Sequence, residues 1–200
     1  NGLNPAGNSS EDSLSTYLTL ANNFNLPQKE RLKYNQKAFL IISDQPNDSL
    51  NRANLFKIAN RYYNMDNWED YKKTVKVVLE RSKSINDTVN ILKSFIYLGD
   101  YYGAQGESDT AFMYYFKAEK IYLNRQDNYN LARTRLNKAL LKYNESDFLG
   151  TEIEVFKALS AIKGEKANDL VYESYNLLGL IYNEQEDYDK AIGYQNKALA

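Results

Sequence analysis

Cysteine and histidine are both absent from the 200 residues of this sequence. Without cysteine there are no disulfides, thiolate nucleophiles or cysteine-bound metals, but the compartment stays open because oxidised and reduced proteins alike can lack cysteine. Without histidine the chain has neither the commonest metal ligand nor the side chain that titrates near neutral pH. A histidine-based catalytic relay or pH switch is excluded, and we expect no catalytic residue, metal or cofactor in this segment.

The sequence also lacks an excess of charge of one sign and lacks long apolar runs. Lys plus Arg number 25 against 26 Asp plus Glu, for a net charge of −1, so no long basic run is available to neutralise a phosphate backbone. No stretch approaches the roughly 20 consecutive apolar residues that span a bilayer. We therefore expect this segment neither to bind nucleic acid nor to insert into a membrane.

Proline and glycine are few, at three and nine residues, while 43% of the chain is apolar. The long stretches between them are rich in Leu, Ala, Lys, Glu, Asn and Tyr, a composition typical of nearly continuous helix. This predicts an all-α protein with a continuous core. The first ten residues are rich in Gly, Pro, Asn and Ser, and we expect residues 1–10 to be a disordered lead-in.

Small residues recur along the chain at an interval of 40, which indicates an internal repeat. The interval predicts one solenoid over residues 11–200, in five units at about 11–45, 46–85, 86–126, 127–166 and 167–200. In the third unit, Phe95, Leu98, Gly99 and Tyr102 follow the helical spacing i, i+3, i+4 and i+7. The predicted repeat core comprises Ala38, Ala59, Val78, Gly99, Tyr102, Ala111, Ala118, Ala158, Gly179, Tyr182, Ala191 and Ala198.

The connections between units carry Asn and Asp, which accept hydrogen bonds from the unpaired N–H groups of a helix start. We expect N-caps within Asn47-Asp48, Asn86-Asp87, Asp127-Asn128 and Asn168-Asp169. Inside the third unit, Gly106 provides the left-handed conformation of a helix C-terminus.

The fourth unit departs from the pattern, because Arg135, Lys138 and Lys142 stand where the third unit has apolar residues. A charged core is unfavourable. Moving the register one residue later gives an apolar stripe of Leu136, Ala139, Leu140 and Tyr143 instead. Under this register, Asn137 and Asn144 would face outward on the concave side. The sequence thus suggests a one-residue deletion in the turn between Tyr143 and Phe148.

The best-preserved unit reads YNLLGLIYNEQEDYDKAIGYQNKAL over residues 175–199. With LGDYYGAQGESDTAFMYYFKA over 98–118, it resembles the tetratricopeptide repeat (TPR) family, and the resemblance covers about residues 11–200. It implies a right-handed α-solenoid of five helix hairpins, in which the first helices line a concave face. The 40-residue unit, longer than the usual period of about 34, resembles the arrays of bacterial sensor kinases and transcription regulators.

The concave face would be rich in Asn with aromatic residues between them, a surface that suits an extended peptide. The alternative is that these residues are ordinary solvated positions. Asn60 and Lys93 loosely match residues with which TPR domains grip a peptide C-terminus, but Phe56 and Asp100 oppose that chemistry. The predicted groove residues are Phe56, Asn60, Tyr63, Asn64, Lys93, Ile96, Asp100, Asn137, Asn144, Asn176 and Asn183.

These observations favour a protein or peptide interaction module, the sensory input domain of a bacterial signalling protein, with the periplasm favoured over the cytoplasm. The chain stops inside a helical pattern, so we expect a fragment of a longer protein. The alternative function is a structural or oligomerising scaffold with no groove ligand. In either case the end repeats are candidates for forming a homodimer.

Overall fold

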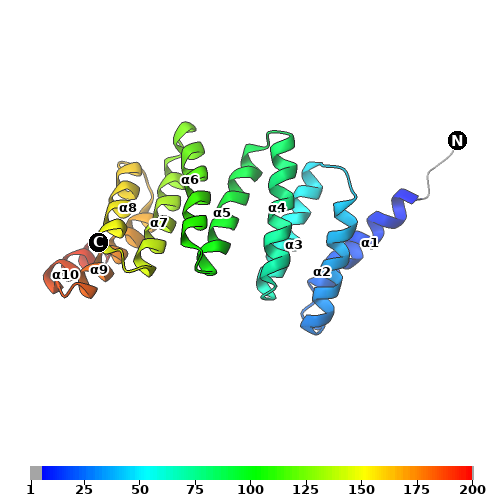
Figure 1. The fold of residues 1–200 in the computed structure, drawn as a ribbon, viewed down its shortest axis with the longest axis horizontal. Coiled ribbons are helices and arrows are strands. Elements are labelled where there is room, and N and C mark those ends of the chain that lie inside the picture. The colour runs from blue at the N-terminus through cyan, green and yellow to red at the C-terminus, as the bar shows by residue number, and fades with distance from the viewer. Residues whose placement is uncertain (1–5, 200) are drawn as a thin grey trace. The chain divides into compact units, whose positions relative to one another are not determined.

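The computed structural model describes residues 6–199, with side chains from Ser13 onward. These residues form ten α-helices and no strand (Figure 1). The helices are α1 (Ala6–Ala21), α2 (Gln28–Ser43), α3 (Ser49–Asn64), α4 (Trp68–Ser84), α5 (Thr88–Ala104), α6 (Ser108–Asn124), α7 (Asn128–Asn144), α8 (Phe148–Ala161), α9 (Asn168–Glu184) and α10 (Tyr188–Leu199). This confirms the prediction of an all-α protein built from helix hairpins.

The chain divides into two compact units, residues 1–98 and 99–200, and the boundary falls inside α5. In unit 1, α1 packs on α2, α2 on α3, and α3 on α4. In unit 2, α7 packs on α8 and α9 packs on α10. Successive hairpins are in contact because α6 packs on α7 and α8 packs on α9. Continuity of the solenoid across the boundary, and its handedness, stay predictions.

The helices from α4 onward begin at intervals of 20 residues, half of the 40-residue repeat. A three-residue turn recurs between successive helices from α3 onward, except between α8 and α9, which residues 162–167 connect. Its second residue adopts positive φ, and the N–H of its third residue donates to the carbonyl five positions earlier over 2.8–3.0 Å. This hydrogen bond pairs carbonyls that a helix end leaves free. The positive-φ residues of these turns are Asp66, Asn86, Gly106, Gln126, Ser146 and Glu186.

Aspartates cap three of the first helices as expected. Asp48, Asp87 and Asp127 each accept a hydrogen bond from the backbone N–H three residues later, which satisfies one free donor of the helix start. The expectation for the fifth hairpin was wrong. Its N-cap is Ala167, without a side-chain hydrogen bond, while the carboxylate of Asp169 accepts from the hydroxyl of Tyr129 instead.

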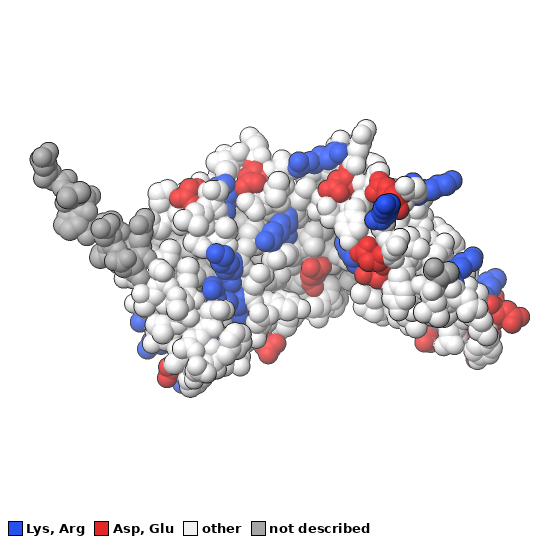
Figure 2. All heavy atoms as spheres, turned by 180° about the vertical axis from the view of Figure 1, so that it is seen from behind, with Lys and Arg blue, Asp and Glu red and all other residues white. Residues whose placement is uncertain are grey.

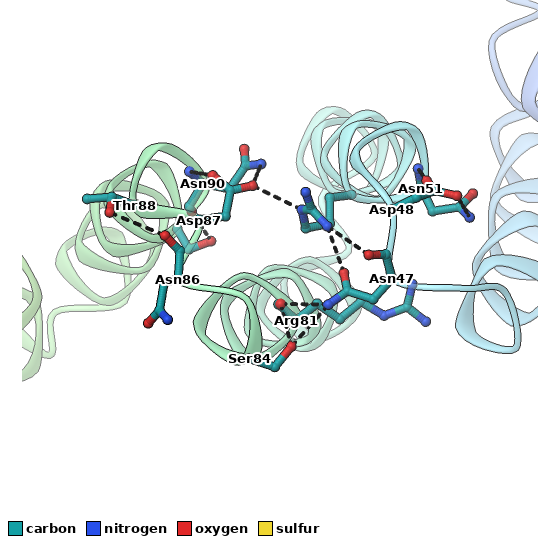
Figure 3. A network of polar contacts seen from close by, with 11 residues as sticks. Asn47, Asp48, Asn51, Arg81, Ser84, Asn86, Asp87, Thr88 and Asn90 are labelled. Carbon is teal, nitrogen blue, oxygen red and sulfur yellow. Dashed lines mark hydrogen bonds and ion pairs between the residues drawn. The ribbon is translucent and has the colours of Figure 1, made fainter.

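Two arginines link the hairpins of unit 1 through the connecting turns (Figure 3). Arg52, which is buried, donates to both the carbonyl and side-chain oxygens of Asn47 and pairs with Asp87 over 3.0 Å. Arg81 donates to the carbonyls of Ile42 and Ser43 at the end of α2. A guanidinium suits this position, because a helix C-terminus carries partial negative charge.

The small repeat residues lie where neighbouring helices approach closely. A Cβ on Gly99 would lie 2.5 Å from the Tyr115 ring, so only glycine lets α5 pack this tightly on α6. Tyr102, Tyr182 and Ala198 are half-buried. The remaining members of the predicted core are buried, namely Ala38, Ala59, Val78, Gly99, Ala111, Ala118, Ala158, Gly179 and Ala191.

The prediction of a disordered lead-in over residues 1–10 differs from the structure at residues 6–10, which belong to α1. Residues 1–5 lie outside the described part of the chain. Because helix growth adds one hydrogen bond for each residue fixed, an established helix can extend through residues of modest propensity. The polar composition of residues 6–10 alone did not reveal this.

The inferred deletion in the fourth unit is wrong. The turn between α7 and α8 spans residues 145–147, as long as the turns at 105–107 and 185–187. The register is therefore unshifted, Lys138 lies in the core with 3% exposure, and Leu140, which the shift placed inside, is 51% exposed. Burial of Lys138 is tolerated because Glu119 and Glu154 lie within 2.7 and 3.0 Å of its ammonium.

Candidate interaction surface

A cavity of about 240 Å³ in unit 2 brings three predicted groove residues together. It lies mainly between α5 and α7, the first helices of successive hairpins, with one residue from α6. Polar groups and the exposed side chain of Leu140 share its lining. The lining comprises Asp100, Gly103, Ala104, Tyr115, Asn137, Leu140, Leu141 and Asn144.

Asp100 is the charged group of this cavity, and Tyr115 orients it. The buried Tyr115 reaches from α6 and donates its hydroxyl to the carboxylate over 2.6 Å. The surrounding protein raises the pKa of Asp100, and the hydrogen bond from Tyr115 opposes that rise. One carboxylate oxygen is thus held by the protein, so the other is available to accept a hydrogen bond from a partner.

Asn137 and Asn144 line the same cavity for a reason that the sequence analysis missed. They were assigned to the groove through the shifted register, which is wrong. In the actual register they stand 40 residues after Tyr97 and Ala104, and α7 presents them toward α5 because residues four and seven apart share one face of a helix. Asn137 is half-buried, and Asn144 is exposed.

Phe56 does not belong to an open groove, so its assignment was wrong. Its side chain is 3% exposed, because Tyr97 packs edge-on against it with ring centroids 5.4 Å apart. Lys93 lies above the same ring, with its ammonium 4.2 Å from the centroid. Burial lowers the pKa of Lys93. Position 56 therefore serves to pack α3 against the start of α5 within unit 1.

Among the predicted groove residues of unit 1, the exposed aromatic one is Tyr63, near the end of α3. It is 49% exposed and meets Trp68 and Tyr71 of α4 in edge-to-face contacts at 5.0 and 5.6 Å. Asn60 and Asn64 are exposed on the same helix. This arrangement leaves one ring surface supported from beneath and open to a partner, with amide groups beside it.

The remaining predicted groove residues show no common site. Ile96 is half-buried, Asn183 is exposed, and Asn176 accepts a hydrogen bond from Gln195 over 3.4 Å. Sequence analysis also missed Leu140 and Tyr115 as cavity residues. Tyr115 is buried, yet its hydroxyl reaches the cavity. The hydroxyl of a buried tyrosine usually has a hydrogen-bond partner. This rule could have indicated that Tyr115 reaches a polar group such as Asp100.

The described surface carries charges of both signs. On the face seen in Figure 2, Lys and Arg are interspersed with Asp and Glu. Between residues 13 and 199, no group of three or more carboxylates is placed to hold a metal ion. No helix in the part of the chain that is described is long and apolar enough to cross a membrane. The candidate surface described above offers amides, the Asp100 carboxylate and the exposed side chains of Leu140 and Tyr63.

Comparison with known proteins identifies solved structures of similar fold. No family model matches the sequence, and no curated protein matches it. A putative kinesin light chain from Podospora anserina with nearly identical TPR-like repeats is similar, with a TM-score of 0.69 and 12% identity over 96% of this chain and 92% of that one. BtubC (BKLC) from P. vanneervenii is similar with a TM-score of 0.64 and 19% identity, over 96% of this chain and 70% of that one.

These similarities concern the fold alone, because the identities are low. They show that the helix hairpins form a TPR-like α-solenoid. Repeats of this kind support a general protein-interaction or scaffold module. The narrower resemblance to bacterial signalling arrays stays a prediction.

Proposed function

We propose that this chain is a protein-interaction module that binds a segment of a partner polypeptide on the first helices of its hairpins. The observation that carries the proposal is the unit 2 cavity, where α5 and α7 present Asp100, Asn137 and Asn144 beside the exposed Leu140. Such a mixture can hydrogen-bond a peptide backbone and hold an apolar side chain. In unit 1, the first helix α3 carries the exposed Tyr63 and Asn60, which offer similar chemistry.

A peptide selection with site-resolved mapping tests this proposal. Peptides selected from a random library against the whole chain are titrated into isotope-labelled protein, and the perturbed amides are mapped by NMR. We expect the perturbations on α5 and α7, and we expect Asp100→Asn combined with Asn137→Ala to weaken binding about tenfold, equal to about 1.4 kcal/mol. Asn124→Ala, at an exposed asparagine of α6, is the matched control and should leave binding unchanged.

Perturbations confined to the second helices α6, α8 and α10 would refute the proposed surface. The same conclusion would follow if the double variant and the control bound equally well. Folding of each variant is checked by its helical circular dichroism, so that loss of binding is not confused with loss of structure.

The narrower form of the proposal is that the module receives a signal for a bacterial signal-transduction protein. It is supported by the resemblance of the 40-residue repeats to arrays in sensor kinases and transcription regulators. The full-length gene tests it directly. A kinase or helix-turn-helix sequence in the same reading frame would support the role, and its absence there would oppose it.

A scaffold that self-associates is the second candidate, favoured by the apolar surface of α10. Tyr188, Ile192 and Leu199 are 58%, 60% and 80% exposed. Light scattering across a concentration series distinguishes the two functions. A dimer that Ile192→Lys disrupts would support the scaffold, whereas a monomer at every concentration would oppose it.

A further inference from the structure

A second cavity, of about 570 Å³, lies between α1 and α3 in unit 1. This volume falls within the roughly 300–1,000 Å³ of sites that hold small ligands. Three leucines supply apolar surface, and hydroxyl, amide and cationic groups supply the rest. None of the described lining residues is acidic. They are Leu14, Ser15, Leu18, Thr19, Asn22, Leu50, Asn54, Lys57 and Arg61.

Arg61 carries a positive charge with which no described carboxylate pairs. Its Nε and Nη1 atoms are buried and have no hydrogen-bond partner. Burial lowers the pKa of Arg61, and the charge of nearby Arg31 lowers it further. An arginine stays protonated nonetheless. The end of α3 offers Arg61 partial negative charge, but the buried Nε and Nη1 atoms still have no hydrogen-bond partner.

The neighbouring cations add to this positive field. Lys57 donates to the amide oxygen of Asn54 over 3.4 Å. Arg31 donates to the carbonyl of Ala21 over 3.3 Å and lies 4.1 Å above the ring of Phe24. No ion pair joins Arg31, Lys57 or Arg61 to a described side chain, whereas Arg52 on the same helix as Arg61 pairs with Asp87.

Unpaired buried charge is costly, and a bound anion would offset that cost. Resting on the proposed function, we propose that this cavity receives an acidic side chain of the partner polypeptide. The carboxylate of a glutamate or aspartate lies beside Arg61 and Lys57, since a guanidinium matches carboxylate geometry. An apolar residue next to it in the partner packs on Leu14, Leu18 and Leu50.

A blocked tripeptide gives a direct test, because it has no charge other than its glutamate side chain. Acetyl-Leu-Glu-Leu-amide is titrated into protein with labelled leucine methyl groups. We expect the methyl signals of Leu14, Leu18 and Leu50 to shift in a saturable way. Acetyl-Leu-Gln-Leu-amide should bind about tenfold more weakly or not at all, because it lacks the carboxylate.

Matched variants identify the cations responsible. Lys57→Gln removes an exposed charge without disturbing the core, and Arg61→Gln removes the buried one. Each substitution should weaken binding of the glutamate peptide about tenfold. Lys33→Gln, at an exposed lysine of α2 outside the cavity lining, removes the same charge and should leave the affinity unchanged.

Stability gives a second readout that needs no ligand. Because no described carboxylate compensates Arg61 in the free protein, Arg61→Met should raise the melting temperature. Removal of a structurally important arginine would lower it. Two outcomes would overturn the proposal. One is the absence of methyl shifts with the glutamate peptide, and the other is equal shifts with sodium phosphate alone, which would indicate a general anion site.

Failure here is distinguishable from failure of the proposed function. If selected peptides perturb α5 and α7 while the glutamate tripeptide leaves Leu14, Leu18 and Leu50 unchanged, the acidic subsite is wrong and the interaction module stands. If neither selected peptides nor the tripeptide bind to first helices, both are wrong.

Discussion

Lys138 and Glu119 form an ion pair inside unit 2, with the ammonium nitrogen 2.7 Å from Oε2. Lys138 occupies the position that Leu98 and Leu178 hold 40 residues before and after it. The same Glu119 also pairs with Arg135 over 2.9 Å. The ring of Phe112 lies 4.6 Å from the ammonium. One core position of the repeat has thus changed from apolar to ionic without a change of register.

Removing one partner of this pair should destabilise the fold. Breaking a buried ion pair costs about 3–5 kcal/mol, because it leaves an uncompensated charge. Glu119 retains some exposure, with its side chain 13% accessible, and Glu154 still pairs with Lys138 in the variant. We therefore expect Glu119→Gln to lower the free energy of unfolding by about 2 kcal/mol, below that range. Urea unfolding followed by circular dichroism measures this change.

The control is Glu80→Gln, because Glu80 pairs with Lys83 on the surface. An exposed pair contributes less than about 1 kcal/mol. Equal losses from the two substitutions would contradict the assignment of Lys138 to an ion pair of the core.

The pH dependence of stability should also report this ion pair. Burial tends to raise the pKa of Glu119, but the hydrogen bonds and charges of Lys138 and Arg135 outweigh it and hold the pKa below its usual range. A carboxylate with a lowered folded pKa stabilises the fold above its unfolded pKa, about 4.3 for glutamate. That stabilisation is lost as pH falls through the folded pKa.

We therefore expect the native protein to lose more unfolding free energy than Glu119→Gln as pH falls below about 4.3. Urea midpoints measured at a series of pH values give both curves. Other carboxylates titrate in both proteins, so the difference between the curves isolates Glu119. Parallel curves would show that the ion pair with Lys138 does not lower the pKa of Glu119.

The repeated turn predicts opposite effects for two substitutions. Gly106 has φ of 75°, and a Cβ added to it would meet nothing within 4 Å, so Gly106→Ala introduces backbone strain without a clash. The left-handed conformation costs a non-glycine residue about 1–2 kcal/mol, and we expect a loss of about 1 kcal/mol in unfolding free energy. Ser146 has φ of 60° at the equivalent position, so Ser146→Gly should be neutral or stabilising. Thermal unfolding tests both, and destabilisation by Ser146→Gly would oppose the explanation.

A glycine inside α5 predicts a linked effect on the cavity. Because a Cβ on Gly99 would lie 2.5 Å from the Tyr115 ring, Gly99→Ala should displace that ring and disturb its hydrogen bond to Asp100. We expect a loss of about 1–3 kcal/mol in unfolding free energy. Gly193 of α10 has open space around it, so Gly193→Ala should stabilise by about 0.5–1 kcal/mol. Fluorescence of the tyrosines and urea unfolding report both changes.

Two outcomes would contradict this explanation. A stabilised Gly99→Ala variant would mean that α5 and α6 have room to separate. Unchanged peptide binding in a folded Gly99→Ala variant would show that the orientation of Asp100 by Tyr115 does not matter for the cavity.

The sequence by itself determined the helical architecture and the 40-residue interval. Both are local properties, since helical spacing and turn residues are set by neighbours in the chain. Small residues such as Gly99 and Ala118 marked positions of close helix packing for the same reason. The aspartates that cap α3, α5 and α7 were also readable, because a cap forms within three residues.

Only the tertiary structure decided which exceptions the core accepts and where cavities open. The burial of Lys138 depends on Glu119 and Glu154, which belong to neighbouring helices, and no spacing within α7 reveals that pairing. Phe56 is buried because Tyr97 and Lys93 of another helix cover it. That no described carboxylate pairs with Arg61 likewise depends on which side chains surround it, a property of the packed chain that no local pattern records.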